Sequence, residues 1–231
     1  MKYYDFPLVS TLRSALGYGG DLRALLGPIE LDLKALAPDL AVTFVVNHDI
    51  PQNPMPDLFV GRCRNTDRYG DPVNERLASA FVLGRRGGLP LVYSDRGVAG
   101  GDDVPTDAYR FAHARCDTAQ MVRFRRVVGD ADEAVILAAP DTIAFRRGRR
   151  AFVVIHKGGG AGRFALDAGQ APALDAGVYV DLLTGARVTV GAGAGLAVDL
   201  PARSAALYVR EDLLGAAPGD PRAAGCEAPP D

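Results

Sequence analysis

Two patterns of apolar residues meet near residue 130, and this change constrains the fold more than any other feature of the sequence. Before residue 130, short apolar runs alternate with helical stretches, as expected for βα units that carry parallel strands. After it, short β-type segments are separated by Gly, Pro and Asp turns at the spacing of an all-β sandwich. We therefore expect an α/β unit over residues 1–130, an antiparallel β-sandwich over residues 131–213, and a disordered tail, rich in Ala, Pro and Gly, over residues 214–231.

The first unit contains three apolar runs that predict strands. They lie at residues 3–8, 41–46 and 89–93. The runs at 41–46 and 89–93 are nearly continuous, so we expect these two strands to be buried.

Helical stretches lie between and after these runs. We expect helices at residues 9–16 and 118–128, the latter with Met121, Phe124 and Val128 on one face. Asp71 and Pro72 predict the N-cap and first residue of another helix, along which Leu77, Ala80, Phe81 and Gly84 follow at helical spacing. A weaker stretch over 21–37 contains Gly27-Pro28, which predicts two short pieces.

The second unit contains eight predicted strands. Their expected ranges are residues 134–139, 142–145, 151–155, 163–166, 178–182, 186–190, 196–200 and 205–209. Thr184-Gly185 and residues 157–160 (KGGG) supply the residues that turns require.

The charge pattern argues against a nucleic-acid partner. The formal net charge is −2 and the pI is near 5.9, without the basic excess that phosphate recognition needs. The arginine pairs are interleaved with acids, which favours solvated positions; they are Arg85-Arg86, Arg125-Arg126, Arg146-Arg147 and Arg149-Arg150.

Three cysteines, Cys63, Cys116 and Cys226, stand at wide spacing. No C-x-x-C pair suggests zinc or redox chemistry, and one disulfide is compatible with the sequence but not required. No stretch approaches the ~20 apolar residues that cross a membrane, so we expect no membrane partner. The first residues, MKYYDFPLVSTLRS, also lack the apolar run of a signal peptide.

The segment most informative about chemistry is the apolar run at 41–46 (AVTFVV), which leads directly into Asn47, His48 and Asp49. A buried parallel strand that ends in polar residues places them at its C-terminal edge, where α/β barrels build their active sites. The alternative is that these side chains only cap the following turn.

Several motifs, in order, resemble the α-amylase family of retaining glycoside hydrolases (glycoside hydrolase family 13). Residues 44–49 (FVVNHD) look like the end of barrel strand seven, 77–83 (LASAFVL) like the helix after it, 88–94 (GLPLVYS) like strand eight, and 4–12 (YDFPLVSTL) like the region of strand six. The pieces 145–148 (FRRG), 152–158 (FVVIHKG) and 177–185 (GVYVDLLTG) are similar to the β-domain that follows the barrel. The likeness covers residues 1–212 and implies a partial (β/α)8 TIM barrel, about strands six to eight, before a C-terminal β-sandwich.

The resemblance implies roles for two residues. Asp49 would be the third catalytic carboxylate, which stabilises the transition state without forming the covalent bond, and His48 would hydrogen-bond a hydroxyl of the sugar being cleaved. The oxocarbenium-like transition state requires nearby negative charge and hydroxyl contacts that tighten as the ring distorts.

Other residues near the motif are candidates for substrate contact: Asn47, Asn53, Tyr93 and Asp95. For Asp95 the simpler reading is an ordinary turn aspartate. His113 and His156 are expected at the surface or in turns, since no second ligand stands at metal spacing.

Two catalytic groups of the family have no counterpart here. A retaining glycosidase needs a carboxylate nucleophile and a carboxylic acid about 5–5.5 Å apart. In the family these follow strands four and five, and no segment of this sequence resembles either motif. We therefore expect the isolated chain to be inactive.

The sequence also lacks a complete metal site or a cofactor motif. Calcium, which the family usually binds, would be ligated mostly by earlier segments. The implied substrate is an α-1,4-glucan such as starch or a maltooligosaccharide, and secretion or a periplasmic location would follow family habit. The alternatives are a non-catalytic carbohydrate-binding or accessory protein and a degenerate product without activity; the oligomeric state is left open.

Overall fold

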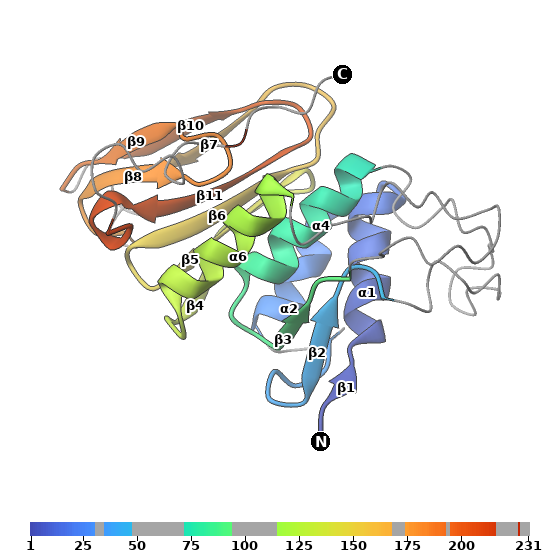
Figure 1. The fold of residues 1–231 in the computed structure, drawn as a ribbon. Coiled ribbons are helices and arrows are strands. Elements are labelled where there is room, and N and C mark those ends of the chain that lie inside the picture. Colours follow the sequence, from blue (N-terminus) through green and yellow to red (C-terminus); the bar gives the residue numbers. More distant parts are fainter. Residues whose placement is uncertain are drawn as a thin grey trace.

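A computed structural model describes residues 1–30, 35–47, 72–93, 115–167, 174–192, 195–215 and 226. These residues form successive layers, seen edge-on in Figure 1. A small parallel sheet lies on one side of a layer of helices, and two antiparallel sheets lie on the other.

The small sheet is parallel, as predicted. Its strands are β1 (Tyr3–Tyr4), β2 (Ala41–Phe44) and β3 (Leu89–Leu91), in the order β1-β2-β3. Tyr4 lies opposite Val42, and Phe44 lies opposite Leu91. The three predicted strands are confirmed in place, although each is shorter than expected.

Two predictions about these strands are wrong. The first strand ends at Tyr4 rather than residue 8, because the Asp5 side chain accepts a hydrogen bond from the Leu8 amide and caps a helix. The strand β3 is not buried: the Leu89 side chain is 54% exposed, since β3 stands at the end of the three-stranded sheet in the part of the chain that is described.

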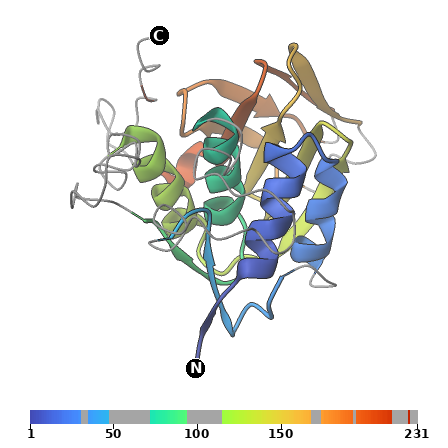
Figure 2. The same cartoon turned by 90° about the vertical axis from the view of Figure 1, so that its right-hand side faces the viewer.

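The helices form one layer. They are α1 (Phe6–Leu12), its continuation as a π-helix η1 (Arg13–Gly17), a 3-10 turn η2 (Leu22–Leu25), α2 (Leu26–Glu30), α4 (Pro72–Gly84) and α6 (Cys116–Val128). Figure 2 shows α1, α2, α4 and α6 side by side with the large sheet behind them.

Most helix predictions are confirmed, but two boundaries are wrong. Met121, Phe124 and Val128 are buried on one face of α6, as expected. The helix expected at 9–16 begins at Phe6, behind the Asp5 cap. The stretch over 21–37 does begin as two short pieces, η2 and α2, but they meet at Leu25 and Leu26, and Gly27-Pro28 lies within α2. A proline is tolerated there because the first turn of a helix needs no backbone donor.

The six-stranded sheet is antiparallel, with the order β4-β5-β6-β11-β8-β9. Its strands are β4 (Glu133–Ala138), β5 (Thr142–Arg147), β6 (Ala151–His156), β8 (Gly177–Asp181), β9 (Arg187–Val190) and β11 (Ser204–Arg210). A second sheet pairs β7 (Gly162–Leu166) with β10 (Leu196–Leu200), and a 3-10 turn η5 (Glu211–Leu213) follows β11. All eight predicted strands of this part are confirmed to within two residues at each end.

The six-stranded sheet is buried on both faces. Along β6, Val153 and Ile155 belong to the core shared with the helices, whereas Phe152 and Val154 belong to the core shared with β7 and β10. This alternation is that of a β-sandwich whose outer side is covered by a second sheet. The helix-side core draws residues from both sides of residue 130, and the domain boundary there remains a prediction.

Two arginines expected in solvent are buried. Arg85 and Arg147 are each 2% exposed, so the prediction of solvated arginine pairs is wrong for them. Arg147 donates to the carbonyl oxygens of Gly84 and Gly129, at 2.8 and 2.6 Å, which lie at the C-terminal ends of α4 and α6. Unpaired carbonyls at helix ends accept such donors, and the positive charge suits that end of the helix dipole.

The C-terminal stretch is described at Leu214, Gly215 and Cys226, and its other residues lie outside the described part. Cys226 forms a disulfide with Cys116, and its amide donates to the carbonyl of Leu183 at 2.7 Å. These two contacts hold Cys226, and the disordered tail expected over residues 214–231 stays a prediction. The sequence had left the pairing of the three cysteines open.

Candidate functional site

The predicted site begins where β2 ends. Asn47 follows the strand by three residues and is fully buried, at 0% exposure. His48 and Asp49 come directly after it and lie outside the described residues, as do Asn53 and Asp95. The structure therefore places the strand that leads into the motif and its first polar residue, while the roles of His48 and Asp49 stay predictions.

Tyr93 is brought to the same edge of the sheet as Asn47. It follows β3 by two residues, is partly buried, and packs against the core between the helices and the large sheet. Because β2 and β3 are parallel neighbours, their C-terminal ends meet at one edge. Of the six predicted site residues, Asn47 and Tyr93 lie in the described part of the chain, and the roles of all six stay predictions.

Aromatic rings pack together at the C-terminal ends of β1 and β2. The ring of Phe44 meets the rings of Tyr4 and Phe6 edge-to-face, with centroids 5.5 and 5.3 Å apart. Phe44 is fully buried, whereas Tyr4 and Phe6 are 40% and 46% exposed. Such edge-to-face pairs add stability beyond the burial of the rings themselves, and they fix the end of β2 just before Asn47.

Asp5, a buried carboxylate at the end of β1, was not singled out by the sequence. Its backbone amide donates to the Val42 carbonyl at 3.0 Å, which continues the pairing of β1 with β2. Its Oδ1 accepts hydrogen bonds from the amides of Leu8 and Leu36, at 3.0 and 3.1 Å. Burial raises the pKa of Asp5, and these two amides and the charge of Arg85 oppose that rise.

The hydrogen bonds of Asp5 indicate a structural role. A carboxylate that accepts from the first turn of α1 and from Leu36 holds two segments of backbone in place. The signal was present in the sequence, because an aspartate followed two residues later by a proline is typical of a helix start. Asp5 thus positions the strand beside β2 and is not a candidate acid or base.

His156 is a buried histidine, which corrects the expectation of a surface or turn position. It is 7% exposed, its Nδ1 lies 2.8 Å from the Thr142 hydroxyl, and its Nε2 lies 2.9 Å from the Gly160 carbonyl. A carbonyl can only accept, so Nε2 carries a proton. The two contacts hold the ring between β5 and the turn after β6. His113 lies outside the described residues.

Among the described residues, no group of three or more His, Cys, Asp or Glu side chains is arranged to hold a metal ion. No helix in this part of the chain is long and apolar enough to cross a membrane.

No family model matches the chain. A curated protein, the α-amylase of Aeromonas hydrophila, is 38% identical over 156 residues, which is 67% of this chain and 31% of that protein. The chain thus spans about a third of the length of the curated relative it matches.

Solved structures with the same fold include three enzymes. The α-amylase I of Eisenia fetida superposes with a TM-score of 0.64 at 20% identity, over 89% of this chain and 48% of that chain. An α-amylase of Malbranchea cinnamomea gives 0.63 at 18% identity, over 91% and 45%. The cyclomaltodextrin glucanotransferase CldA gives 0.59 at 22% identity, over 88% and 43%. At these identities the likeness establishes the fold.

Proposed function

The chain belongs to the α-amylase family, and from this premise we propose that it is the C-terminal part of a hydrolase that acts on α-1,4-glucans with retention of configuration. We assign β1, β2 and β3 to strands six, seven and eight of a (β/α)8 barrel and the antiparallel sheets to the β-domain that follows it. One observation carries the proposal. Three adjacent parallel strands stand in chain order, and buried Asn47 follows the middle strand by three residues, directly before His48 and Asp49.

The proposed chemistry centres on Asp49. At the C-terminal edge of the barrel, its carboxylate would stabilise the positive charge that develops on the sugar ring, and His48 would hold a ring hydroxyl. Asn47, Asn53, Tyr93 and Asp95 would contact the sugars on either side. In support of a glucan substrate, a mutant of the Eisenia fetida enzyme has been solved as a complex with maltohexaose.

The nucleophile and the general acid are proposed to come from a part of the enzyme outside these 231 residues. Cleavage with retention needs both carboxylates, about 5–5.5 Å apart, and no motif for either was found in the sequence. Calcium, if the enzyme uses it, would likewise be ligated mainly outside this chain. Reading the gene upstream of the Met1 codon tests this: an open frame that encodes an aspartate and a glutamate at the ends of two further strands is expected, and a stop codon with a ribosome-binding site would contradict it.

A direct assay of the purified chain separates the proposal from its main alternative, a non-catalytic carbohydrate-binding protein. Incubation with soluble starch should release no reducing sugar, and passage over immobilised amylose should show no retention beyond that of an unrelated protein. Retention without turnover would favour the binding protein, provided that Asp49→Asn weakens it and Asp199→Asn, an exposed change on β10, does not. Turnover by the isolated chain would contradict the placement of the nucleophile and acid outside it.

A further inference from the structure

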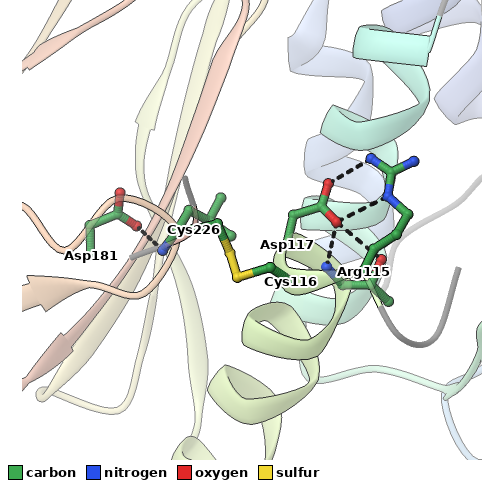
Figure 3. The surroundings of a disulfide bond; sticks show 7 residues. Arg115, Cys116, Asp117, Asp181 and Cys226 are labelled. Carbon is green, nitrogen blue, oxygen red and sulfur yellow. Dashed lines mark hydrogen bonds and ion pairs between the residues drawn. A yellow bond between two sulfur atoms is a disulfide. The ribbon is translucent and has the colours of Figure 1, made fainter. Parts of the chain in front are cut away.

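The disulfide between Cys116 and Cys226 joins two parts of the fold that are far apart in the sequence. The two cysteines are 110 residues apart, and their Cα atoms are 5.7 Å apart, within the range of ordinary disulfides. Cys116 is the first residue of α6, in the helix layer. Figure 3 shows Cys226 reaching from the large sheet toward the start of that helix.

On the sheet side, Cys226 is attached to a tightly held turn. Its amide donates to the carbonyl of Leu183, which follows β8. The carboxylate of Asp181 accepts hydrogen bonds from the Leu183 amide at 3.1 Å, the Thr184 hydroxyl at 2.6 Å and the Leu207 amide at 2.9 Å. Asp181 is 2% exposed, so Cys226 is bound to a rigid, buried part of the six-stranded sheet.

On the helix side, Cys116 is exposed and lies in the first turn of a helix of 13 residues, where the helix dipole favours the negative charge of a leaving thiolate. The flanking residues Arg115 and Asp117 form an ion pair at 2.9 Å. Cys226 is partly exposed, so a small thiol can reach the bond.

We propose that the Cys116–Cys226 bond is a redox-sensitive tie between the helix layer and the antiparallel sheet, formed in an oxidising compartment and opened by dithiols. In the opening step a dithiol thiolate attacks the Cys226 sulfur, the Cys116 thiolate leaves, and the second thiol of the reagent then displaces Cys226. The protein gains two thiols and the reagent becomes a disulfide. Disulfides of this kind persist in secreted or periplasmic proteins and are rare in the cytosol.

Opening the bond should lower stability without unfolding the chain. Closing a loop of 110 residues restricts the unfolded chain strongly. The native packing of α6 does not depend on the bond, because Met121 and Phe124 are buried in the core that also contains Leu207 of the sheet. Reduction should therefore lower the melting temperature by about 5 to 15 °C and leave the far-UV circular dichroism at room temperature unchanged.

The test compares the wild-type chain with Cys226→Ser and with a matched control, Cys63→Ser, each with and without dithiothreitol. The melting temperatures of wild type and Cys63→Ser should fall on reduction. Cys226→Ser should show the melting temperature of reduced wild type with and without dithiothreitol. Mass spectrometry of non-reduced peptides should show Cys116 joined to Cys226 in protein from an oxidising host. Free thiols at both positions, a bond that includes Cys63, or an unchanged melting temperature on reduction of wild type would overturn the proposal. The last comparison stands even if Cys226→Ser does not fold, and none of these readouts involves glucan chemistry.

Discussion

The parallel sheet and the six-stranded sheet differ in how completely they are covered. The six-stranded sheet has a core on each face, one with the helices and one with β7 and β10. The parallel sheet has helices on one face, while Tyr4 and Leu89 are 40% and 54% exposed. The parallel sheet, which leads into the predicted site, is thus less completely covered than the six-stranded sheet, as expected if its strands complete a larger sheet.

This difference predicts that truncating a core side chain lowers the free energy of unfolding most in the β-sandwich. Phe152 is fully buried and its ring stacks on that of Tyr208, with centroids 4.7 Å apart. Phe152→Ala should lower the free energy of unfolding by about 3 to 5 kcal/mol. Leu89→Ala, at an exposed position of β3, should cost less than about 1 kcal/mol. Urea titration measures both values, and similar costs would remove the contrast between the two sheets.

A substitution at the junction between the helices and the six-stranded sheet should lower the free energy of unfolding nearly as much. Arg147 donates to carbonyls of both helix ends and lies 3.9 Å from the Glu133 carboxylate. Arg147→Ala would leave those buried acceptors without this donor and would remove one of the positive charges near the carboxylate, at a cost of about 3 kcal/mol. Arg187, whose side chain is 65% exposed in its pair with Glu211, is the matched control, and Arg187→Ala should cost at most about 1 kcal/mol. Equal costs would show that Arg147 is not a structural connector.

In the parallel sheet, a close contact between Gly88 and Thr43 should make a larger residue at position 88 destabilising. Gly88 has a φ of 77°, and a Cβ there would lie 2.4 Å from Cγ2 of buried Thr43 in β2. Gly88→Ala should therefore cost about 2 kcal/mol, from backbone strain and overpacking together. Gly129 also has a positive φ, but a Cβ there would meet no atom within 4 Å. Gly129→Ala should cost about 1 kcal/mol, and a larger loss than that of Gly88→Ala would argue against close β2–β3 packing.

The smallest expected effect is a change with pH at the same junction. Burial raises the pKa of Glu133 above its ordinary 4.5, opposed by the Arg86 amide and the charges of Arg85, Arg147 and Arg125. A raised pKa means that the folded state holds the proton more tightly, so this contribution to stability is present in acid and is lost as the pH rises through the raised pKa.

The comparison of wild type with Glu133→Gln isolates that contribution. The free energy of unfolding of wild type, relative to the variant, should fall as the pH rises from the ordinary value of 4.5 through the raised pKa. Urea unfolding curves across that range give the difference directly. A difference that stays constant or rises with pH would show that the opposing arginine charges outweigh burial.

Local patterns in the sequence predicted the two regions unequally. The strands of the sandwich followed from alternation and turn residues, and the buried face of α6 followed from the spacing of Met121, Phe124 and Val128. The start of α1 was missed although the Asp5 and Pro7 signal is local. The burial of Arg147 and His156 has no local signal, because their partners Gly84 and Thr142 are 63 and 14 residues away.

The site itself was predicted in part from position and in part from family resemblance. Asn47 and Tyr93 reach one sheet edge because parallel strands share their C-terminal side, which the apolar runs predicted. The roles of His48 and Asp49 came from the resemblance, since composition and spacing carry no information about a transition state. The pairing of Cys116 with Cys226 could not be predicted, because no spacing rule relates cysteines 110 residues apart.

The most direct test of the central claim is the turnover of starch by the protein that the complete reading frame encodes, compared with its Asp49→Asn variant. If Asp49 stabilises the transition state, kcat should fall on the order of a hundred- to a thousand-fold, while the melting temperature stays at the wild-type value. Wild-type turnover in a folded Asp49→Asn variant, or no turnover of starch in the wild-type protein, would contradict the account.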